Sequence, residues 1–259
     1  MQRGFSFVRF SGMLRWLFCF IPVVVFSQPP RVNPRYIKPL WLFNLTYRAQ
    51  LPAADLTVPY GFCNGLGFDL MYKSKRNYIA GVNAFTIFSR NVKNTGYINF
   101  LKDPNGLIFR DDMTPINLNA SMRGGEVLFM FGRLFPSFKK HPEWSWHAAG
   151  GAGFMQHKYL FRAGGTTQFS TAYLPGYDRL RNGPALCQQV GFHYFSLLRL
   201  INFNVSAEVT EAFTKNRRYF DYATRTTDTK NYTDIWVTLK LAWMLPIKAH
   251  TGKESLYFQ

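Results

Sequence analysis

The stretch Tyr232–Leu245, YTDIWVTLKLAWML, has the clearest two-residue period in the chain. From Ile235 onward its odd-numbered positions are all apolar, whereas its even-numbered positions include Asp234 and Lys240. Because successive side chains of a strand point to opposite faces, the period predicts a strand with one apolar face and one mixed face. A soluble sandwich could bury the apolar face against a second sheet, and a transmembrane barrel would turn it to lipid.

Seven further segments share the strand period and are bounded by turn residues. They cover 40–51, 61–73, 78–90, 125–134, 144–159, 186–197 and 200–214. With 232–245 they make eight strands, each of about the 9–11 residues or more that a tilted transmembrane strand requires. No segment has a convincing helical period.

The connections between these segments alternate in length. Long connections span 52–60, 91–124, 160–184 and 215–231, and short ones span 74–77, 135–143 and 198–199. Outer-membrane barrels have long extracellular loops and short periplasmic turns, whereas a sandwich gives no reason for this alternation. The sequence therefore predicts an all-β fold, a closed antiparallel eight-stranded transmembrane β-barrel over residues 40–248, in the bacterial outer membrane.

The two ends of the chain are expected to lie outside this barrel. Residues 1–27 combine three arginines, an apolar run and a small final residue, which is the pattern of a secretory signal peptide. The Pro-rich residues 28–39 are predicted to be an extended lead-in, because proline donates no ladder hydrogen bond. Residues 252–259 contain ESLYFQ and resemble a protease site left by an expression tag.

The charge pattern argues against nucleic acid as a partner. Without the three arginines of the signal and without Lys253 and Glu254, 27 basic and 13 acidic residues remain, a net charge of +14. This excess is spread along the chain, whereas nucleic-acid binding favours a clustered stripe. Solubility and contact with lipid phosphates explain the basic excess instead. The expected partners are outer-membrane lipid and other outer-membrane proteins, either a larger barrel or a lipoprotein.

Charged residues on the mixed faces are expected to form a network inside the barrel. Charges cannot face hydrocarbon cheaply, and an eight-stranded barrel is just wide enough to be filled by its own side chains. The predicted lumen network consists of Arg48, Asp69, Lys73, Glu126, Glu208 and Lys240. A barrel filled in this way is not an open pore for solutes.

The candidate chemical groups are better explained without catalysis, metal or cofactor. His147 and His157 are ten strand residues apart, about 33 Å, so they cannot share one metal unless the strand is broken. The sequence DPNG at 103–106 is better read as a turn than as part of a calcium site. Cys63 and Cys187 could pair or remain free thiols. No catalytic, cofactor-binding or metal-binding residue is predicted.

Two features are predicted to dock other proteins. Ala148, Gly150 and Ala152 lie on one face of the 144–159 strand, where small side chains would allow close approach of another membrane protein. The 160–184 connection contains turn residues typical of an ordered loop, and Tyr177, Asp178 and Arg179 are its candidate partner contacts. The 91–124 connection is long and rich in apolar residues, which favours packing over the barrel or on a partner.

Taken together, the strands resemble the small eight-stranded outer-membrane barrels of the OmpA and OmpX type. The signal ending VVVFSQ and the closing strand LKLAWMLPI resemble exported barrels of the Bacteroidota. In that phylum many small barrels are accessory subunits of outer-membrane machines, including barrel-assembly and type 9 secretion complexes. The resemblance therefore implies an accessory role in protein export or membrane biogenesis, as part of a protein complex.

Three function hypotheses follow. The first is a non-enzymatic accessory or docking subunit of a multi-protein outer-membrane complex. The second is a lipid-modifying barrel enzyme, which would need His193 or His157 beside Ser196 or a carboxylate near the membrane interface. The third is a structural or adhesive surface barrel that acts alone.

Overall fold

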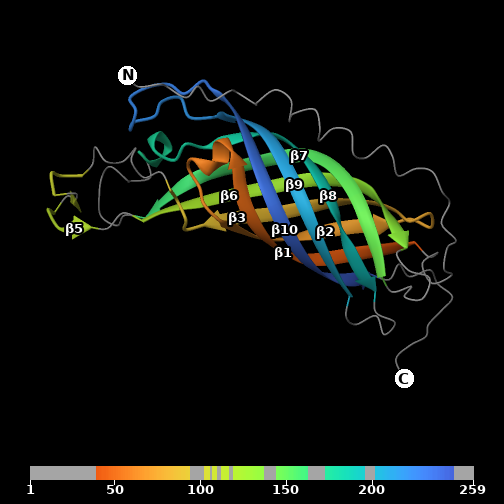
Figure 1. The fold of residues 1–259 in the computed structure, drawn as a ribbon. Helices are drawn as coiled ribbons and strands as arrows, with labels where there is room; N and C mark the ends of the chain where they lie inside the picture. Colours follow the sequence, from red (N-terminus) through yellow and green to blue (C-terminus); the bar gives the residue numbers. More distant parts are fainter. Residues whose placement is uncertain are drawn as a thin grey trace, which may run out of the picture. The chain divides into compact units, whose positions relative to one another are not determined.

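The computed structural model describes residues 39–93, 102–105, 107–109, 112–116, 119–136, 144–162, 173–195 and 202–247. Within them, eight long strands close into one antiparallel barrel (Figure 1), in the order β1, β10, β9, β8, β7, β6, β3, β2. The strands are β1 (Leu40–Ala54), β2 (Cys63–Lys73), β3 (Tyr78–Ser89), β6 (Asn119–Pro136), β7 (Trp144–Arg162), β8 (Arg181–Phe195), β9 (Asn202–Asn216) and β10 (Asn231–Ile247). The predicted all-β, eight-stranded closed barrel is confirmed.

The first and last strands close the barrel. They lie side by side in Figure 1, and their register runs from the pair Trp41–Ile247 to the pair Ala54–Asp234. The stretch Tyr232–Leu245 is thus part of the closing strand, with Leu239 and Leu241 facing outward and Lys240 inward.

Connection lengths divide the barrel into two unequal rims. Between β2 and β3, β6 and β7, and β8 and β9 the connections have four, seven and six residues, and this end is called the short-turn rim. The other connections have 8, 29, 18 and 14 residues, and they define the long-loop rim. The longest of them carries a small separate hairpin of β4 (Ile108–Phe109) and β5 (Pro115–Ile116). The predicted alternation of long and short connections is confirmed.

Two strands begin five or six residues earlier than predicted. β6 starts at Asn119 and β8 at Arg181, whereas the sequence pattern placed these starts at residues 125 and 186. Gly124 and Pro184 ended the predicted loops, but pairing with β7 continues through both residues. Pro184 is tolerated in β8 because its side chain faces outward and because it has no paired residue in β9, so the missing N–H is not needed there.

Other predicted segments lie outside the described residues. These are the signal peptide 1–27, most of the lead-in 28–39 and the tag sequence 252–259. In the described part of the chain, no helix is long and apolar enough to cross a membrane.

The barrel wall alternates regularly between its two faces. Along β9, for example, buried and exposed residues follow one another almost without interruption. The inward residues form two apolar layers. The larger layer, toward the long-loop rim, includes Trp236, Leu128 and Met155, and the smaller layer, toward the short-turn rim, includes Leu42 and Met244. On β2 and β10, the charged residues Asp69 and Lys240 lie between members of these two layers.

Aromatic side chains of neighbouring strands pair on the outer wall near the short-turn rim. The ring centroids are 4.4–6.0 Å apart in the pairs Trp41–Tyr72, Tyr78–Phe131, Phe135–Trp146, Trp144–Tyr194 and Tyr194–Phe203. Trp and Tyr prefer membrane–water interfaces, and aromatic girdles mark the boundary of a transmembrane barrel. This row of pairs indicates where one bilayer interface crosses the wall.

Candidate functional site: the filled lumen, the outer wall and the long-loop rim

A compact charge cluster crosses the middle of the lumen. The Arg48 guanidinium contacts Glu126 at 2.8 Å and Glu208 at 2.9 Å, and the Lys240 ammonium contacts Asp69 at 2.9 Å and Glu208 at 3.2 Å. The Arg48–Glu126 contact is also an aligned hydrogen bond. All five side chains are at most 1% exposed. Burial of this kind requires pairing, because an isolated charge in the interior is very costly.

The cluster joins residues from five strands. Arg48 comes from β1, Asp69 from β2, Glu126 from β6, Glu208 from β9 and Lys240 from β10. The Arg48 guanidinium also lies 3.4 Å from the centre of the Phe85 ring of β3, which adds a cation–π contact. The structure thus brings five of the six predicted network residues together and gives each a partner.

Lys73, the sixth predicted residue, lies elsewhere. It is buried at the last position of β2, where it pairs in register with Leu40 at the beginning of β1. This position is at the short-turn rim, four residues along β2 from Asp69. Lys73 therefore faces the interior as the alternation predicted, but it stands apart from the central cluster.

Three histidines also face the interior. His147 and His193 stack edge to face with 4.4 Å between ring centroids, and both are at most 1% exposed. His157 lies further toward the long-loop rim, where its Nε2 is 2.9 Å from an Asp234 carboxylate oxygen. The hydroxyl of Tyr60 approaches Nδ1 of His157 at 3.3 Å, so this group ties the β1–β2 connection to the wall.

The cysteine and metal questions can be answered for the described residues. Cys63 and Cys187 are both buried and free. In these ranges no cluster of three or more His, Cys, Asp or Glu side chains could hold a metal ion. Asp103 uses its carboxylate to accept the backbone N–H groups of Asn105 and Leu107, which is the turn arrangement expected from the sequence.

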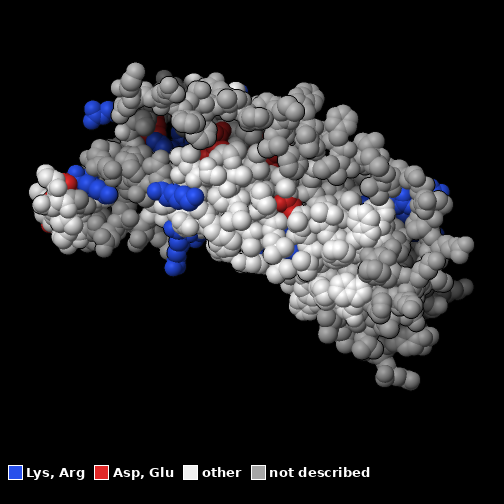
Figure 2. All heavy atoms as spheres, viewed as in Figure 1, with Lys and Arg blue, Asp and Glu red and all other residues white. Residues whose placement is uncertain are grey.

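The outer wall is apolar between the rims. Its exposed side chains include Leu45, Leu66, Phe68, Phe129, Phe131, Leu186, Val190, Val205, Val237, Leu239 and Leu241, each between 36% and 67% exposed. On the face shown in Figure 2, uncharged side chains cover most of the middle of the described surface, where some Asp or Glu atoms are also visible, and Lys and Arg lie mainly toward its ends. An exposed apolar wall of this size suits lipid and is unusual on a soluble monomer.

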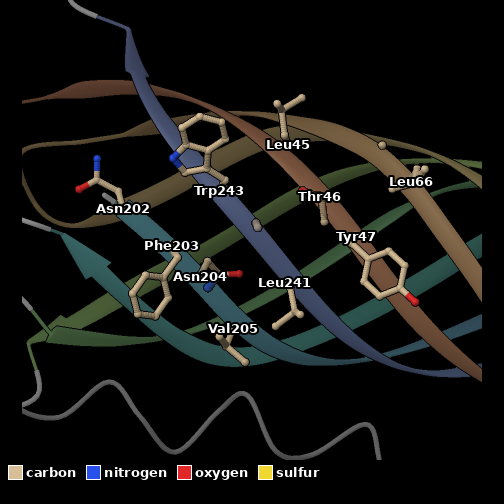
Figure 3. Close-up of a pocket in the computed structure, with 12 residues that line it drawn as sticks. Leu45, Thr46, Tyr47, Leu66, Asn202, Phe203, Asn204, Val205, Leu241 and Trp243 are labelled. Atoms are coloured by element: carbon tan, nitrogen blue, oxygen red, sulfur yellow. The ribbon is translucent and has the colours of Figure 1, made fainter. Parts of the chain in front are cut away.

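A shallow groove runs along this wall across β2, β1, β10 and β9 (Figure 3). The side chains that face it include Leu45, Leu66, Val205, Leu241 and Trp243. They offer an apolar surface with Tyr47 as a polar neighbour.

The predicted docking strip on β7 lies on another part of the wall. Gly150 and Ala152 are exposed and Ala148 is partly exposed, and all three face outward. The strip is bordered by β6, where Phe129 and Phe131 are 67% and 62% exposed. A Cβ added to Gly150 would meet no heavy atom closer than 3.8 Å, so this is an open depression in the wall.

Sequence reasoning missed the polar residue beside this strip. Gln188 of β8 is in register with Gly150 and is exposed on the outer face. It lies six residues from Asn182 and six from Tyr194 on that face. At about 3.3 Å per residue and a strand tilt near 45°, Asn182 and Tyr194 are each displaced from Gln188 by roughly 14 Å along the barrel axis, in opposite directions. Gln188 is therefore near the middle of an apolar band about 25 Å tall. The strict alternation of β8 could have placed it on this face.

The predicted loop contacts have a different role in the structure. Tyr177 and Asp178 are only 7% and 5% exposed, which leaves them little surface for a partner. Asp178 accepts two hydrogen bonds from Arg218, with Nε at 2.6 Å. Arg179 donates to Asp221 at 2.6 Å. These contacts join residues 173–180, which include η6 (Leu174–Gly176), to residues 217–226, and the pair of segments is called the loop clasp.

Packing and electrostatics agree with this role. Gly176 lies directly under the Tyr222 ring, since a Cβ there would come within 1.9 Å of it. Burial, with Tyr222 and Asp221 nearby, raises the pKa of the Tyr177 phenol. The hydrogen bond to Asp178 raises the pKa of the Arg218 guanidinium. The clasp shows that part of the long-loop rim is folded.

Strand closure, a filled interior and an apolar wall with an aromatic row define a small membrane-spanning β-barrel. Among solved structures the chain is similar to Ail, the attachment invasion locus protein of Yersinia pestis, in two crystal structures. The identities are 11% and 12%, with a TM-score of 0.40, and 80% of this chain and 99% of Ail are covered. One of these structures contains the heparin analogue sucrose octasulfate.

The chain is also similar to AlkL, an outer membrane protein whose structure was determined by solid-state NMR in DMPC lipid bilayers. The identity is 14%, the TM-score is 0.35, and 88% of this chain and 99% of AlkL are covered. No protein-family model and no curated protein matches the chain. The assignment of the fold rests on strand pairing within the chain itself.

Proposed function

We propose that this chain is an integral, non-enzymatic β-barrel of the bacterial outer membrane that acts as a docking subunit of a larger membrane complex. The filled lumen argues against transport of solutes, since charged and apolar layers occupy it from rim to rim. The surfaces left for function are the outer wall and the loops. The resemblance stated above favours a complex for protein export or outer-membrane biogenesis.

The observation that carries this proposal is the small-residue strip of β7, where Gly150 and Ala152 are exposed on the outer wall. Small residues on the wall of a membrane protein let a neighbouring membrane protein pack closely against it. Gly150, opposite Gln188, allows a partner to approach the backbone closely. The groove of Figure 3 is lined by larger side chains such as Leu45, Leu241 and Trp243, so β7 and its neighbours β6 and β8 form the preferred docking wall.

Copurification in mild detergent tests the proposal. The wild-type chain should bring down at least one membrane protein in a fixed ratio, and Ala152→Phe should reduce this recovery by tenfold or more. The matched control is Ala49→Phe, which places the same ring on β1, four strands away around the barrel. Recovery of the wild-type chain as a monodisperse monomer would disprove docking, and equal losses for both variants would exclude this wall as the interface.

A lipid-modifying enzyme is the second candidate, because His157 does lie beside the carboxylate of Asp234. Both side chains are at most 1% exposed, so a lipid would need a rearrangement of the Tyr60 connection to reach them. The mass of lipid A should change in cells that lack the protein if this candidate is correct. An unchanged mass spectrum would remove it.

A further inference from the structure

Two cations are neighbours on the outer face near the long-loop rim. Arg123 of β6 and Lys158 of β7 are in register and both point outward. Side chains in such pairs have Cβ atoms about 4.5–5.5 Å apart, and like charges at this separation repel. Asp178 lies 3.8 Å from Lys158, but it already accepts two hydrogen bonds from Arg218. The pair is thus suited to a further anion.

The surroundings of the pair form a graded surface. Arg123 lies over the Phe88 ring at 5.8 Å and donates to the backbone carbonyl of Met122 at 3.2 Å. One step toward the middle of the wall, Thr86 and Gln156 are exposed on either side of Gly125 and in register with it. A Cβ added to Gly125 would meet no heavy atom closer than 3.6 Å, so the position is a shallow depression between two hydrogen-bonding side chains.

The next row toward the middle of the wall is apolar. Val127 and Phe154 are in register, and they are 45% and 47% exposed. From the rim inward the wall therefore presents cations, then a hydroxyl and an amide, and then hydrocarbon. This order matches an amphiphile with an anionic group, a polar head and acyl chains.

We propose that Arg123 and Lys158 hold the phosphate of an outer-leaflet lipid, with Thr86 and Gln156 on its polar head and Val127 and Phe154 against its acyl chains. Arginine and lysine both bind phosphate through charge-assisted hydrogen bonds. The proposal rests on the membrane placement of the barrel and is independent of docking at the β7 strip. Its ligand is a phosphorylated lipid of the membrane rather than a soluble anion, because the apolar row continues directly from the polar one.

Native mass spectrometry of the detergent-purified full chain tests the site. The probes are a phosphorylated, acylated glycolipid, the same lipid after removal of its phosphates, and inorganic phosphate. We expect a lipid adduct that Arg123→Gln/Lys158→Gln weakens by at least about tenfold, since a charge-assisted hydrogen bond is lost at each position. The dephosphorylated lipid should bind the wild-type chain as weakly as the phosphorylated lipid binds the variant.

Two controls keep the charge change constant. Lys215→Gln/Lys230→Gln removes two cations elsewhere near the long-loop rim, and Lys75→Gln/Arg76→Gln removes two from the β2–β3 turn. Both should retain the adduct. Equal weakening in the Lys215/Lys230 variant would overturn the site in favour of a general charge effect. Full retention by the Arg123/Lys158 variant, or complete competition by millimolar inorganic phosphate, would overturn it as well. Migration of unheated samples on gels checks that every variant is folded.

Discussion

The guanidinium of Arg48 lies 2.9 Å from the carboxylate of Glu208, and neither side chain has any exposed surface. Replacing Arg48 by Met would leave Glu126 and Glu208 with much less compensation in the interior. We expect Arg48→Met to lower the free energy of unfolding by about 3–5 kcal/mol, the usual cost of breaking a buried pair. Urea unfolding in lipid vesicles measures it. Arg76→Met, on the exposed β2–β3 turn, is the control, and an equal loss there would contradict the prediction.

The second buried contact, between Lys240 and Asp69, predicts non-additivity. Lys240→Met leaves an uncompensated carboxylate, and Asp69→Asn leaves Lys240 with Glu208 at 3.2 Å as its remaining partner. The double variant removes both members of the pair, so its loss of stability should be smaller than the sum of the two single losses by roughly 1–3 kcal/mol. A double-mutant cycle by urea unfolding measures the coupling, and strict additivity would show that the contact contributes nothing.

The filled lumen predicts an electrically silent barrel. Trp236, Arg48 and Leu42 occupy successive levels of β10 and β1, and all are fully buried. Planar-bilayer recordings of the wild-type chain should therefore show no steady conductance above the bare membrane. A reproducible open channel, in a sample free of porins, would show that the three layers do not close the path.

The loop clasp predicts a local effect of Asp178. Asp178→Asn removes the charge that Arg218 pairs with, so residues 217–226 should exchange their amide hydrogens several-fold faster, without a change at the barrel strands. Hydrogen exchange followed by mass spectrometry resolves the segment. Asp103→Asn, in a separate loop where the side chain accepts backbone hydrogen bonds of its own turn, should leave this exchange unchanged.

Ionisation of the Tyr177 phenol is expected to weaken the loop clasp at alkaline pH. Its pKa is raised above the ordinary value of 10, so the folded clasp favours the neutral phenol. The stabilisation is fully present below pH 10 and is lost as the pH rises through the higher folded pKa. The difference in phenolate absorbance between the wild type and Tyr177→Phe should have its midpoint above pH 10 when folded and near pH 10 in denaturant. Equal midpoints would contradict the burial.

The strand period and the connection lengths were sufficient to predict the barrel, because both can be read from consecutive residues without knowing which strands pair. Alternation also placed Lys240 inside, where Glu208 or another carboxylate was its expected partner, but it could not single out Asp69. Asp69 and Glu208 are far from it in sequence, and their meeting depends on the stagger of the closed sheet. Local turn signals at Gly124 and Pro184 were overridden by pairing with β7, which explains the strand starts that were predicted too late.

In the candidate sites too, local alternation predicted some features, whereas others depend on how the strands and loops pair. The outward positions of Gly150 and Ala152 followed from the period of β7, whereas the adjacency of Gly150 and Gln188 requires the register between two strands. Tyr177 and Asp178 were expected to face a partner because loop residues usually lie on the surface. Their burial depends on a second loop, 217–226, that is far away along the chain.

The central cluster has a mechanical consequence. Its ion pairs link β1, β2, β6, β9 and β10 across the barrel interior. The barrel cross-section therefore cannot flatten without separating buried charges. A wall supported in this way is stiff against sideways pressure. It would carry a load from a neighbouring protein across its width instead of yielding to it.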